Sequence, residues 1–220
     1  MEPPEPSRTE TRFPPPLAVR GEIVSRSKHL ILWLLPLFLL GCSGEASNQW
    51  HGHNITGVMP DLEFELTDHT GQPVTAEDYR GKVTMMFFGY TSCQHVCPVA
   101  LSKLAAATRK LGDQADKVEI LFVAVDPKRD KKVLDDYVTE FTPDLVGLTG
   151  TQKQLKAVAK RYRVAFSYEE PREDGFYIVN HSGAVFVFGP QGKVRLLIDE
   201  QSRTANITED LRRLIEQSSG

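Results

Sequence analysis

The chain has 220 residues, of which 40% are hydrophobic and 25% are charged, and its formal net charge is −3. This length supplies one ordinary hydrophobic core with segments to spare. The mildly acidic balance and the scattered Lys and Arg residues exclude nucleic acid as the main partner, because nucleic-acid-binding domains carry a basic patch.

A targeting segment is predicted at the start of the chain. Arg26 and Lys28 precede the apolar run 30–40, which fits the hydrophobic region of a signal peptide and falls short of the ~20 residues that a spanning helix needs. The run ends in Leu39-Leu40-Gly41-Cys42, which resembles the lipobox of bacterial lipoproteins. In a lipobox the chain is cut before the cysteine and the thiol is acylated. An uncleaved anchor helix is the alternative.

We therefore expect a signal peptide over residues 1–41, then the lipidated Cys42 and a flexible tether over 42–58. Residues 1–23 are rich in Pro and Glu, which is unusual for a signal peptide, so we expect translation to begin near Val24. The folded body would lie on the periplasmic face of a bacterial membrane, with the inner membrane favoured over the outer.

The rest of the chain, residues 59–220, alternates between strand-like and helix-like patterns and predicts one α/β domain with a central, mostly parallel sheet. A short N-terminal hairpin and a final antiparallel hairpin complete it. That order is typical of a thioredoxin-like fold. The expected strands are 62–66, 83–89, 118–125, 145–148, 184–188 and 193–198, and the expected helices are 98–111, 130–141, 151–162 and 208–217.

Cys93 and Cys97 form a C-x-x-x-C pair between an expected strand and an expected helix. The N–H groups and positive end of the helix favour a thiolate there. If Cys42 carries lipid, these two cysteines can only pair with each other or share a metal. Their spacing suits a dithiol, a disulfide or half of a metal site.

A third metal ligand would have to come from elsewhere in the chain. His181 lies in a polar, turn-prone segment before the last hairpin, a region that approaches the start of the first core helix in a thioredoxin-like topology. Two Cys and one His form a soft ligand set suited to Cu(I), and they also accept Cu(II) or zinc. A solvated surface histidine is the simpler interpretation of His181.

Four further features are weaker candidates. His95 lies inside the C-x-x-x-C loop, and His51 and His53 form a His-Gly-His pair in the expected tether. Asp126 follows the second buried strand, where its carboxylate would support a metal-bound histidine or tune a thiol. Lys128-Arg129 would serve as a docking patch. Plain solvent exposure or turn formation is the alternative for each of them.

Three motifs together resemble the Sco/SenC family: Phe88-Gly89-Tyr90-Thr91-Ser92-Cys93 with Cys97-Pro98, then Val125-Asp126-Pro127 with Arg129-Asp130, then Val179-Asn180-His181-Ser182. They occur in family order over roughly residues 57–200. The resemblance implies a thioredoxin-like fold that carries one copper ion on Cys93, Cys97 and His181. It also implies delivery of copper, or of electrons, to the CuA centre in subunit II of cytochrome c oxidase.

One position departs from the family pattern. The family loop commonly reads C-P-D-x-C-P, whereas Gln94 and His95 stand here in place of Pro and Asp. The site therefore loses a carboxylate and gains an imidazole, which can act as a further ligand or a pH-sensitive neighbour.

Two functions remain open at this point. The first is a copper-binding assembly factor, which is not an enzyme in the turnover sense and would exchange copper with periplasmic copper chaperones. The second is a thiol-disulfide oxidoreductase that uses Cys93 and Cys97 to keep the CuA cysteines of its partner reduced, supplied by periplasmic thiol reductants. A peroxiredoxin-type peroxidase and a purely structural lipoprotein are weaker alternatives.

Overall fold

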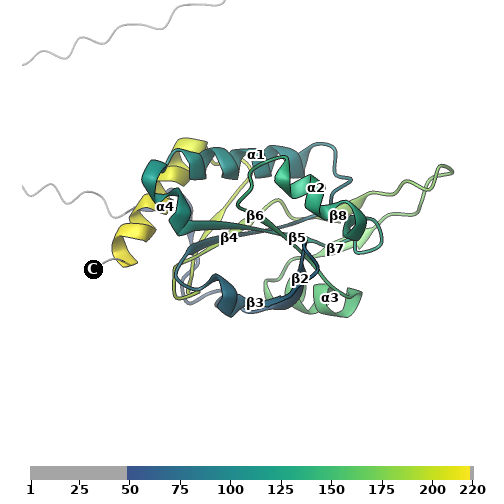
Figure 1. Cartoon of the computed structure of the whole chain (residues 1–220), viewed down its shortest axis with the longest axis horizontal. Coiled ribbons are helices and arrows are strands. Elements are labelled where there is room, and N and C mark those ends of the chain that lie inside the picture. Colours follow the sequence, from purple (N-terminus) through teal and green to yellow (C-terminus); the bar gives the residue numbers. More distant parts are fainter. Residues whose placement is uncertain (1–48, 219–220) are drawn as a thin grey trace, which may run out of the picture. The chain divides into compact units, whose positions relative to one another are not determined.

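The computed structural model describes residues 49–218, so the expected signal peptide and lipidated Cys42 lie outside the described part. Within it, eight strands form one mixed sheet in the order β1-β10-β9-β4-β5-β6-β2-β3, and helices cover both faces (Figure 1). The expected α/β architecture is confirmed, but the expectation of mostly parallel pairing is wrong, because only β4–β5 and β5–β6 are parallel among the strand pairs of this sheet in the described residues. The elements are β1 (His53–Asn54), β2 (Glu65–Asp68), β3 (Pro73–Thr75), β4 (Val83–Gly89), α1 (Val96–Arg109), β5 (Val118–Ala124), α2 (Leu134–Thr139), β6 (Leu145–Thr149), α3 (Gln152–Arg161), β7 (Phe166–Tyr168), β8 (Val179–His181), β9 (Val185–Phe188), β10 (Val194–Ile198) and α4 (Thr204–Ser218), with 3-10 turns at Ala76–Tyr79, Gly112–Lys117 and Asp130–Lys132.

Strand β4 lies at the centre of the sheet, parallel to β5 and antiparallel to β9. Its side chains alternate between two cores: Phe87 packs under α1, α2 and α4, and Phe88 packs towards α3. Both rings are fully buried, and each such burial contributes roughly 1.5–3 kcal/mol. A strand covered on both faces explains the continuous apolar run of its sequence.

Helix α1 begins at Val96, two residues earlier than the sequence pattern predicts. Pro98 is therefore the third helical residue, where its missing N–H would have had no partner within the helix. As a consequence, Cys97 lies in the first turn of the helix and not in the loop before it.

Part of the expected tether is attached to the domain, which corrects the tether's predicted end at residue 58. Strand β1 pairs antiparallel with β10, with His53 opposite Leu197. The buried carboxylate of Asp210 accepts hydrogen bonds from the backbone N–H groups of His51 at 3.1 Å and Gly52 at 2.8 Å. A two-residue strand has no periodicity of its own, so the sequence pattern could not indicate this contact.

The N-terminal hairpin is confirmed as β2 paired with β3. Its first strand begins at Glu65 rather than at residue 62, although Leu62 and Phe64 are buried as the alternation requires. The backbone N–H of Glu63 donates to the Tyr162 hydroxyl at 2.9 Å, and that of Leu62 donates to the Gly192 carbonyl. These backbone groups therefore bond outside a strand ladder.

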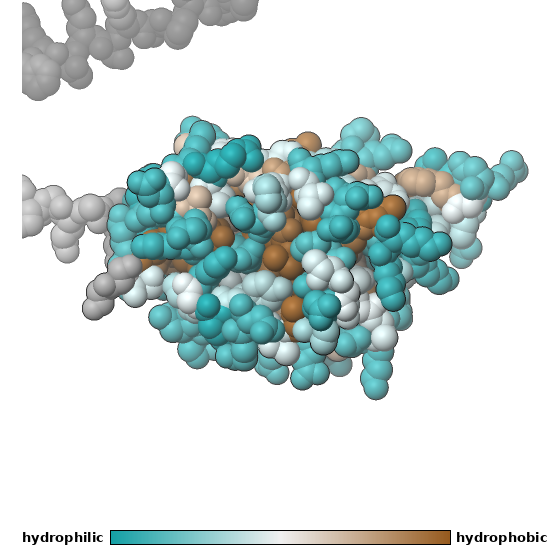
Figure 2. All heavy atoms as spheres, viewed as in Figure 1, coloured by the Kyte–Doolittle hydropathy of each residue, from teal (hydrophilic) through white to brown (hydrophobic). Residues whose placement is uncertain are grey.

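A second, two-stranded sheet joins β7 to β8, with Phe166 opposite His181, and the sequence pattern did not predict this sheet. On the face drawn in Figure 2, hydrophilic side chains cover most of the surface. Within residues 49–218, no helix combines the length and apolar character needed to span a bilayer.

Candidate metal and thiol site

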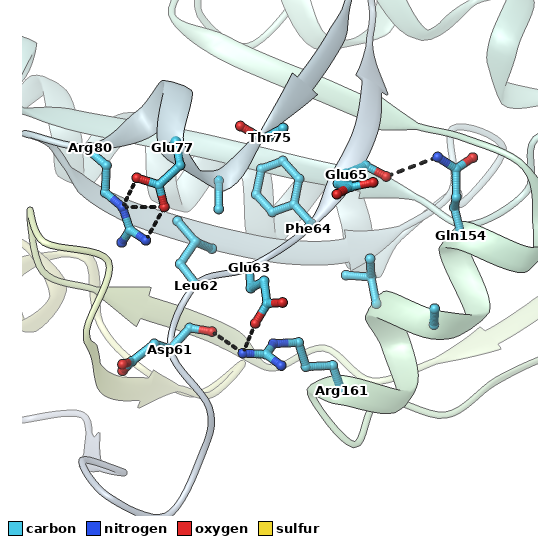
Figure 3. Close-up of a pocket in the computed structure, with 13 residues that line it drawn as sticks. Asp61, Leu62, Glu63, Phe64, Glu65, Thr75, Glu77, Arg80, Gln154 and Arg161 are labelled. Atoms are coloured by element: carbon cyan, nitrogen blue, oxygen red, sulfur yellow. Dashed lines mark hydrogen bonds and ion pairs between the residues drawn. The ribbon is translucent and has the colours of Figure 1, made fainter.

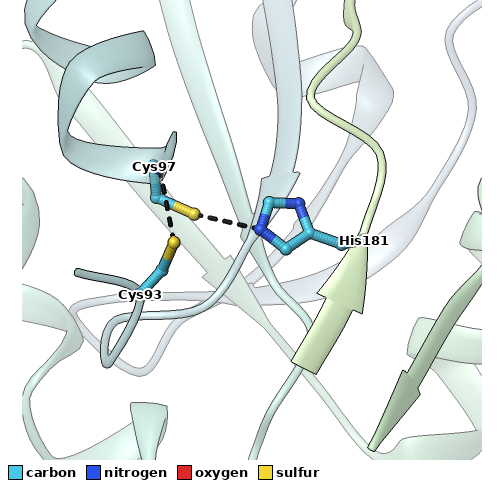
Figure 4. Close-up of side chains that lie close together, drawn as sticks. All are labelled: Cys93, Cys97 and His181. Carbon is cyan, nitrogen blue, oxygen red and sulfur yellow. Dashed lines mark hydrogen bonds between the residues drawn. The ribbon is translucent and has the colours of Figure 1, made fainter. Parts of the chain in front are cut away.

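Two cysteines that are close in sequence and a histidine 84 residues beyond the second of them meet past the end of β4 (Figure 4). Cys93 comes from the loop after β4, Cys97 from the first turn of α1 and His181 from the end of β8. One ligand atom from each lies within 4.8 Å of the other two, and Cys97 Sγ is 3.4 Å from His181 Nε2. This is the one grouping of three or more potential metal ligands among residues 49–218.

The imidazole of His181 is oriented by its own strand end. Its Nδ1 lies 3.1 Å from the carbonyl oxygen of Ser182, which can only accept, so Nδ1 carries the proton. In the neutral ring Nε2 then presents its lone pair towards the thiols. The rings of Tyr90 and Phe87 contact the imidazole edge to face, with centroids 5.6 and 6.0 Å away.

The two thiols have different environments. Burial acts to raise the pKa of Cys93, but hydrogen bonds from the backbone N–H groups of Cys97, His95 and Val96 outweigh it, so the pKa lies below its usual value. Cys97 is fully buried, and burial raises its pKa far above the usual value. Cys93 is therefore the more accessible thiol and ionises more readily, whereas Cys97 is sheltered from solvent.

A glycine makes room for the buried sulfur. A Cβ atom at Gly89 would lie 2.7 Å from Cys97 Sγ and 2.6 Å from Cε2 of Phe122, closer than real side chains approach. The last residue of β4 is therefore restricted to glycine because the first turn of α1 and the Phe122 ring close directly over it.

A buried carboxylate holds the loop that carries Cys93. Asp130 accepts hydrogen bonds from the Thr91 N–H at 2.9 Å, the Thr91 hydroxyl at 2.7 Å and the Asp126 N–H at 3.0 Å. Burial raises the pKa of Asp130 to about 6, and the hydrogen bonds from Thr91 and Asp126 oppose that rise. Asp130 thus ties the loop after β4 to the loop after β5.

The hydrogen bonds of Asp126 go to residues other than the three candidate ligands. Its carboxylate accepts from the Arg129 guanidinium and from the Tyr177 hydroxyl at 3.0 Å. The guanidinium lies over the Tyr177 ring at 3.7 Å and 5.5 Å from the Tyr90 ring, which in turn contacts His181. Direct support of the metal site by Asp126 stays a prediction, and the structure supplies an indirect path through Arg129 and Tyr90.

The side chains of the weaker candidates are not among the three clustered ligands. His95 is exposed at the start of α1. His51 and His53 pair with carboxylates instead, at 3.0 Å to Glu209 and 3.5 Å to Asp199. Lys128 borders a pocket of about 490 Å³ that also contains Asp126.

The pocket drawn in Figure 3, of about 730 Å³, lies between the 61–65 segment and α3 and holds no cysteine or histidine. Its arginines are already paired: Arg80 binds Glu77, and Arg161 binds Glu63. The thiol cluster therefore remains the better candidate for chemistry.

Residue types and spacing did not single out Tyr90 or Asp130 as site residues, and they indicated Arg129 only as part of a docking patch. All three stand inside the motifs that carry the family resemblance, so a signal was present. Their roles depend on contacts between separate loops, which residue types and spacing do not show.

Comparison with known proteins decides the family. The SCO1/SenC family pattern matches residues 58–216 of this chain. The chain belongs to the SCO1/SenC family. It is 39% identical over 156 residues to the mouse mitochondrial protein SCO2 homolog, covering 70% of this chain and 61% of that protein. Overall, the chain spans about half to three fifths of the length of the curated relatives it matches.

Solved SCO1/SenC structures share the fold. Bradyrhizobium japonicum ScoI with copper bound is 34% identical, with a TM-score of 0.64 over 70% of this chain and 98% of that one. A SCO1/SenC family lipoprotein from Bacillus anthracis is 25% identical, with a TM-score of 0.59 over 70% of this chain and 94% of that one. The expected family and thioredoxin-like fold are therefore confirmed.

Proposed function

We propose that this SCO1/SenC protein binds one copper ion through Cys93, Cys97 and His181 and delivers it during assembly of cytochrome c oxidase, to the CuA centre of subunit II. The observation that carries the proposal is the convergence of two sulfurs and an imidazole nitrogen of His181 within 4.8 Å of one another. Copper bound to the Bradyrhizobium relative supports the identity of the metal.

The donor set fits copper. Two thiolates and one neutral imidazole are soft ligands, and a three-ligand set suits Cu(I) better than zinc, which usually takes a fourth. The side of the site that faces the core is shielded from solvent, because Cys97 is fully buried and the Phe87 and Tyr90 rings contact His181. Copper would supply the bond that holds the loop after β4 to the end of β8.

The site opens towards solvent on the Cys93 side. A pocket of about 420 Å³ there is lined by Cys93 and His95 from the loop and by Arg172 and Phe176 from the β7–β8 connection. Partner thiols therefore meet Cys93 first, while Cys97 and His181 retain the cargo until a partner ligand replaces them. Delivery by stepwise ligand exchange follows from this one-sided access.

A Cu(I) titration of residues 43–220 against a chromogenic chelator tests the proposal. We expect one tight equivalent in the wild type, and weaker binding in Cys93→Ser, Cys97→Ser and His181→Ala. His53→Ala is the matched control, because that histidine contacts Asp199 and lies outside the cluster. Affinity that is unchanged in His181→Ala would remove this histidine from the site.

A thiol-disulfide reductase role remains the second candidate, and the difference between the two thiols favours it. The Cys93 thiolate would attack a partner disulfide, form a mixed disulfide and release one partner thiolate. Cys97 would then lose its proton and attack Cys93 Sγ, forming the Cys93–Cys97 disulfide and releasing the second partner thiol, so that two electrons pass to the partner. Partner reduction that persists in His181→Ala would support this role.

We also propose that Cys42 carries lipid and holds the domain at the periplasmic face of the inner membrane. The Leu39-Leu40-Gly41-Cys42 sequence and the Bacillus anthracis lipoprotein relative support this placement. Labelling cells with an alkyne fatty acid should mark the wild type and leave Cys42→Ala unlabelled. Equal labelling of both would contradict it.

A further inference from the structure

Strand β8, which ends in His181, needs attachment to the body of the domain if that histidine is to stay beside the thiols. The strand pairs with β7 in a two-stranded sheet that is separate from the eight-stranded one. Val179, at its start, is buried in the core on the α3 side, whereas Asn180 is exposed and His181 is half-buried. Contacts outside the strand ladder therefore contribute to how firmly the imidazole is held.

Arg129, in the loop after β5, holds Tyr177, which lies just ahead of β8. Its Nη1 donates a hydrogen bond to the carbonyl oxygen of Tyr177 at 2.9 Å, and the guanidinium carbon lies 3.7 Å from the centroid of the Tyr177 ring. Its Nε donates to the carboxylate of Asp126, which also accepts from the Tyr177 hydroxyl at 3.0 Å. Tyr177 is therefore fixed at its backbone, at its ring and at its hydroxyl.

A second set of contacts runs from the same guanidinium to the imidazole. The guanidinium carbon of Arg129 lies 5.5 Å from the centroid of the Tyr90 ring, and that ring meets the His181 ring edge to face at 5.6 Å. A guanidinium within about 6 Å of an aromatic ring centroid is attracted to the face of that ring. The Arg129 side chain is only 22% exposed, so it is committed to contacts inside the domain. Arg129 therefore joins the end of β4 to the segment that leads into β8.

We propose that Arg129 is a positioning residue for the copper site, because it holds His181 against the two sulfurs. It acts by fixing Tyr177 ahead of β8 and Tyr90 beside the imidazole ring. This inference rests on the proposed copper function. The planar guanidinium suits the task because it donates in two directions while its face stacks on a ring, which a lysine ammonium does not do. The two sulfurs belong to the loop after β4 and to α1, so loosening β8 should displace the nitrogen ligand alone.

A double-mutant cycle on copper affinity tests this role. Arg129→Lys keeps the charge but loses the two-directional fork, and we expect its Cu(I) affinity to fall about tenfold to a hundredfold, the range found when groups that orient metal ligands are removed. In the His181→Ala background the same substitution should change affinity by no more than about twofold, because the ligand that Arg129 positions is absent. Unchanged affinity in Arg129→Lys, or the same fold loss in both backgrounds, would overturn the inference.

Amide hydrogen exchange in the metal-free protein provides a second readout that does not depend on copper. Arg129→Lys should speed exchange in β8 by a larger factor than in β5, because the lost contacts hold the small sheet and not the centre of the large one. A substitution that merely lowers overall stability would speed exchange by the same factor in both strands. Equal factors would therefore contradict a positioning role for Arg129.

Arg161→Lys is the matched control. Arg161 also binds a carboxylate, that of Glu63, and a backbone carbonyl oxygen, that of Asp61 at 3.3 Å, but it lies on α3 and outside the ligand cluster. Its replacement should leave copper affinity unchanged and speed exchange in β8 no more than in β5, and an equal loss of affinity in this control would overturn the inference. Absence of copper binding in the wild type would instead overturn the proposed function, and the exchange comparison would still show whether Arg129 holds β8.

Discussion

Cys97 Sγ and His181 Nε2 lie 3.4 Å apart although 84 positions separate them in the chain. Cys97 is placed by the first turn of α1 and His181 by the end of β8, a strand that pairs with β7 in a separate two-stranded sheet. The site therefore depends on the position of β8 relative to the main sheet, which the packing of His181 against Phe87 and Tyr90 maintains.

The space at Gly89 should be required for both stability and metal binding. Gly89→Ala would force its Cβ against Cys97 Sγ and the Phe122 ring, an overpacking that costs about 1–3 kcal/mol. We expect a lower urea midpoint and weaker copper binding. Gly189→Ala, where a Cβ would meet nothing closer than 3.9 Å, is the control and should match the wild type.

The two thiols should react at different rates. Because the pKa of Cys93 is lowered and that of Cys97 is raised, iodoacetamide should modify Cys93 first at pH 7. Mass spectrometry of Cys97→Ser and Cys93→Ser should show fast labelling of the first variant and slow labelling of the second. Equal rates would contradict the asymmetry on which the reductase alternative depends.

Asp130 should make stability depend on pH. Its folded pKa of about 6 exceeds the ordinary value of 3.8, so the folded state holds this proton more tightly. The stabilisation from that proton is full below pH 4 and is lost as pH rises to 6, a change of about 3 kcal/mol at 1.36 kcal/mol per pKa unit. Asp130→Asn should lack this component when urea unfolding is compared at pH 4 and pH 7. The same pH dependence in both proteins would exclude Asp130 as its source.

The Asp126–Arg129 pair should matter for stability more than its solvent-exposed counterparts. Asp126→Asn would leave the Arg129 guanidinium without its buried counter-ion, a loss of about 3–5 kcal/mol. Removing the exposed partner of Lys193 by Asp61→Asn should cost about 1 kcal/mol or less for the ion pair itself. Urea unfolding at pH 7 compares the two variants. Equal losses of unfolding free energy would contradict a larger contribution from the buried Asp126–Arg129 pair.

The sequence indicated the central strands well because burial on both faces leaves a continuous apolar run. The bounds of β4 match the prediction, and those of β5 differ by one residue. The β7–β8 sheet was missed because β7 has three residues with no fully buried side chain, so it carries no alternating pattern. The expected helix over 130–141 divides at Val133 into a 3-10 turn and α2.

The candidate ligands could be selected from residue types, but their support could not. Cys93 and Cys97 are close in sequence, and the family motifs indicated His181. Asp130 holds the loop that carries Cys93 through contacts between separate loops, which only the three-dimensional arrangement reveals.

X-ray absorption spectroscopy of the Cu(I)-loaded domain is the most direct test of the central claim. The structure predicts a copper shell of two sulfurs and one imidazole nitrogen in the wild type, and loss of the nitrogen in His181→Ala with both sulfurs retained. A wild-type shell with fewer than two sulfurs, or a nitrogen that persists without His181, would contradict a copper site built from Cys93, Cys97 and His181.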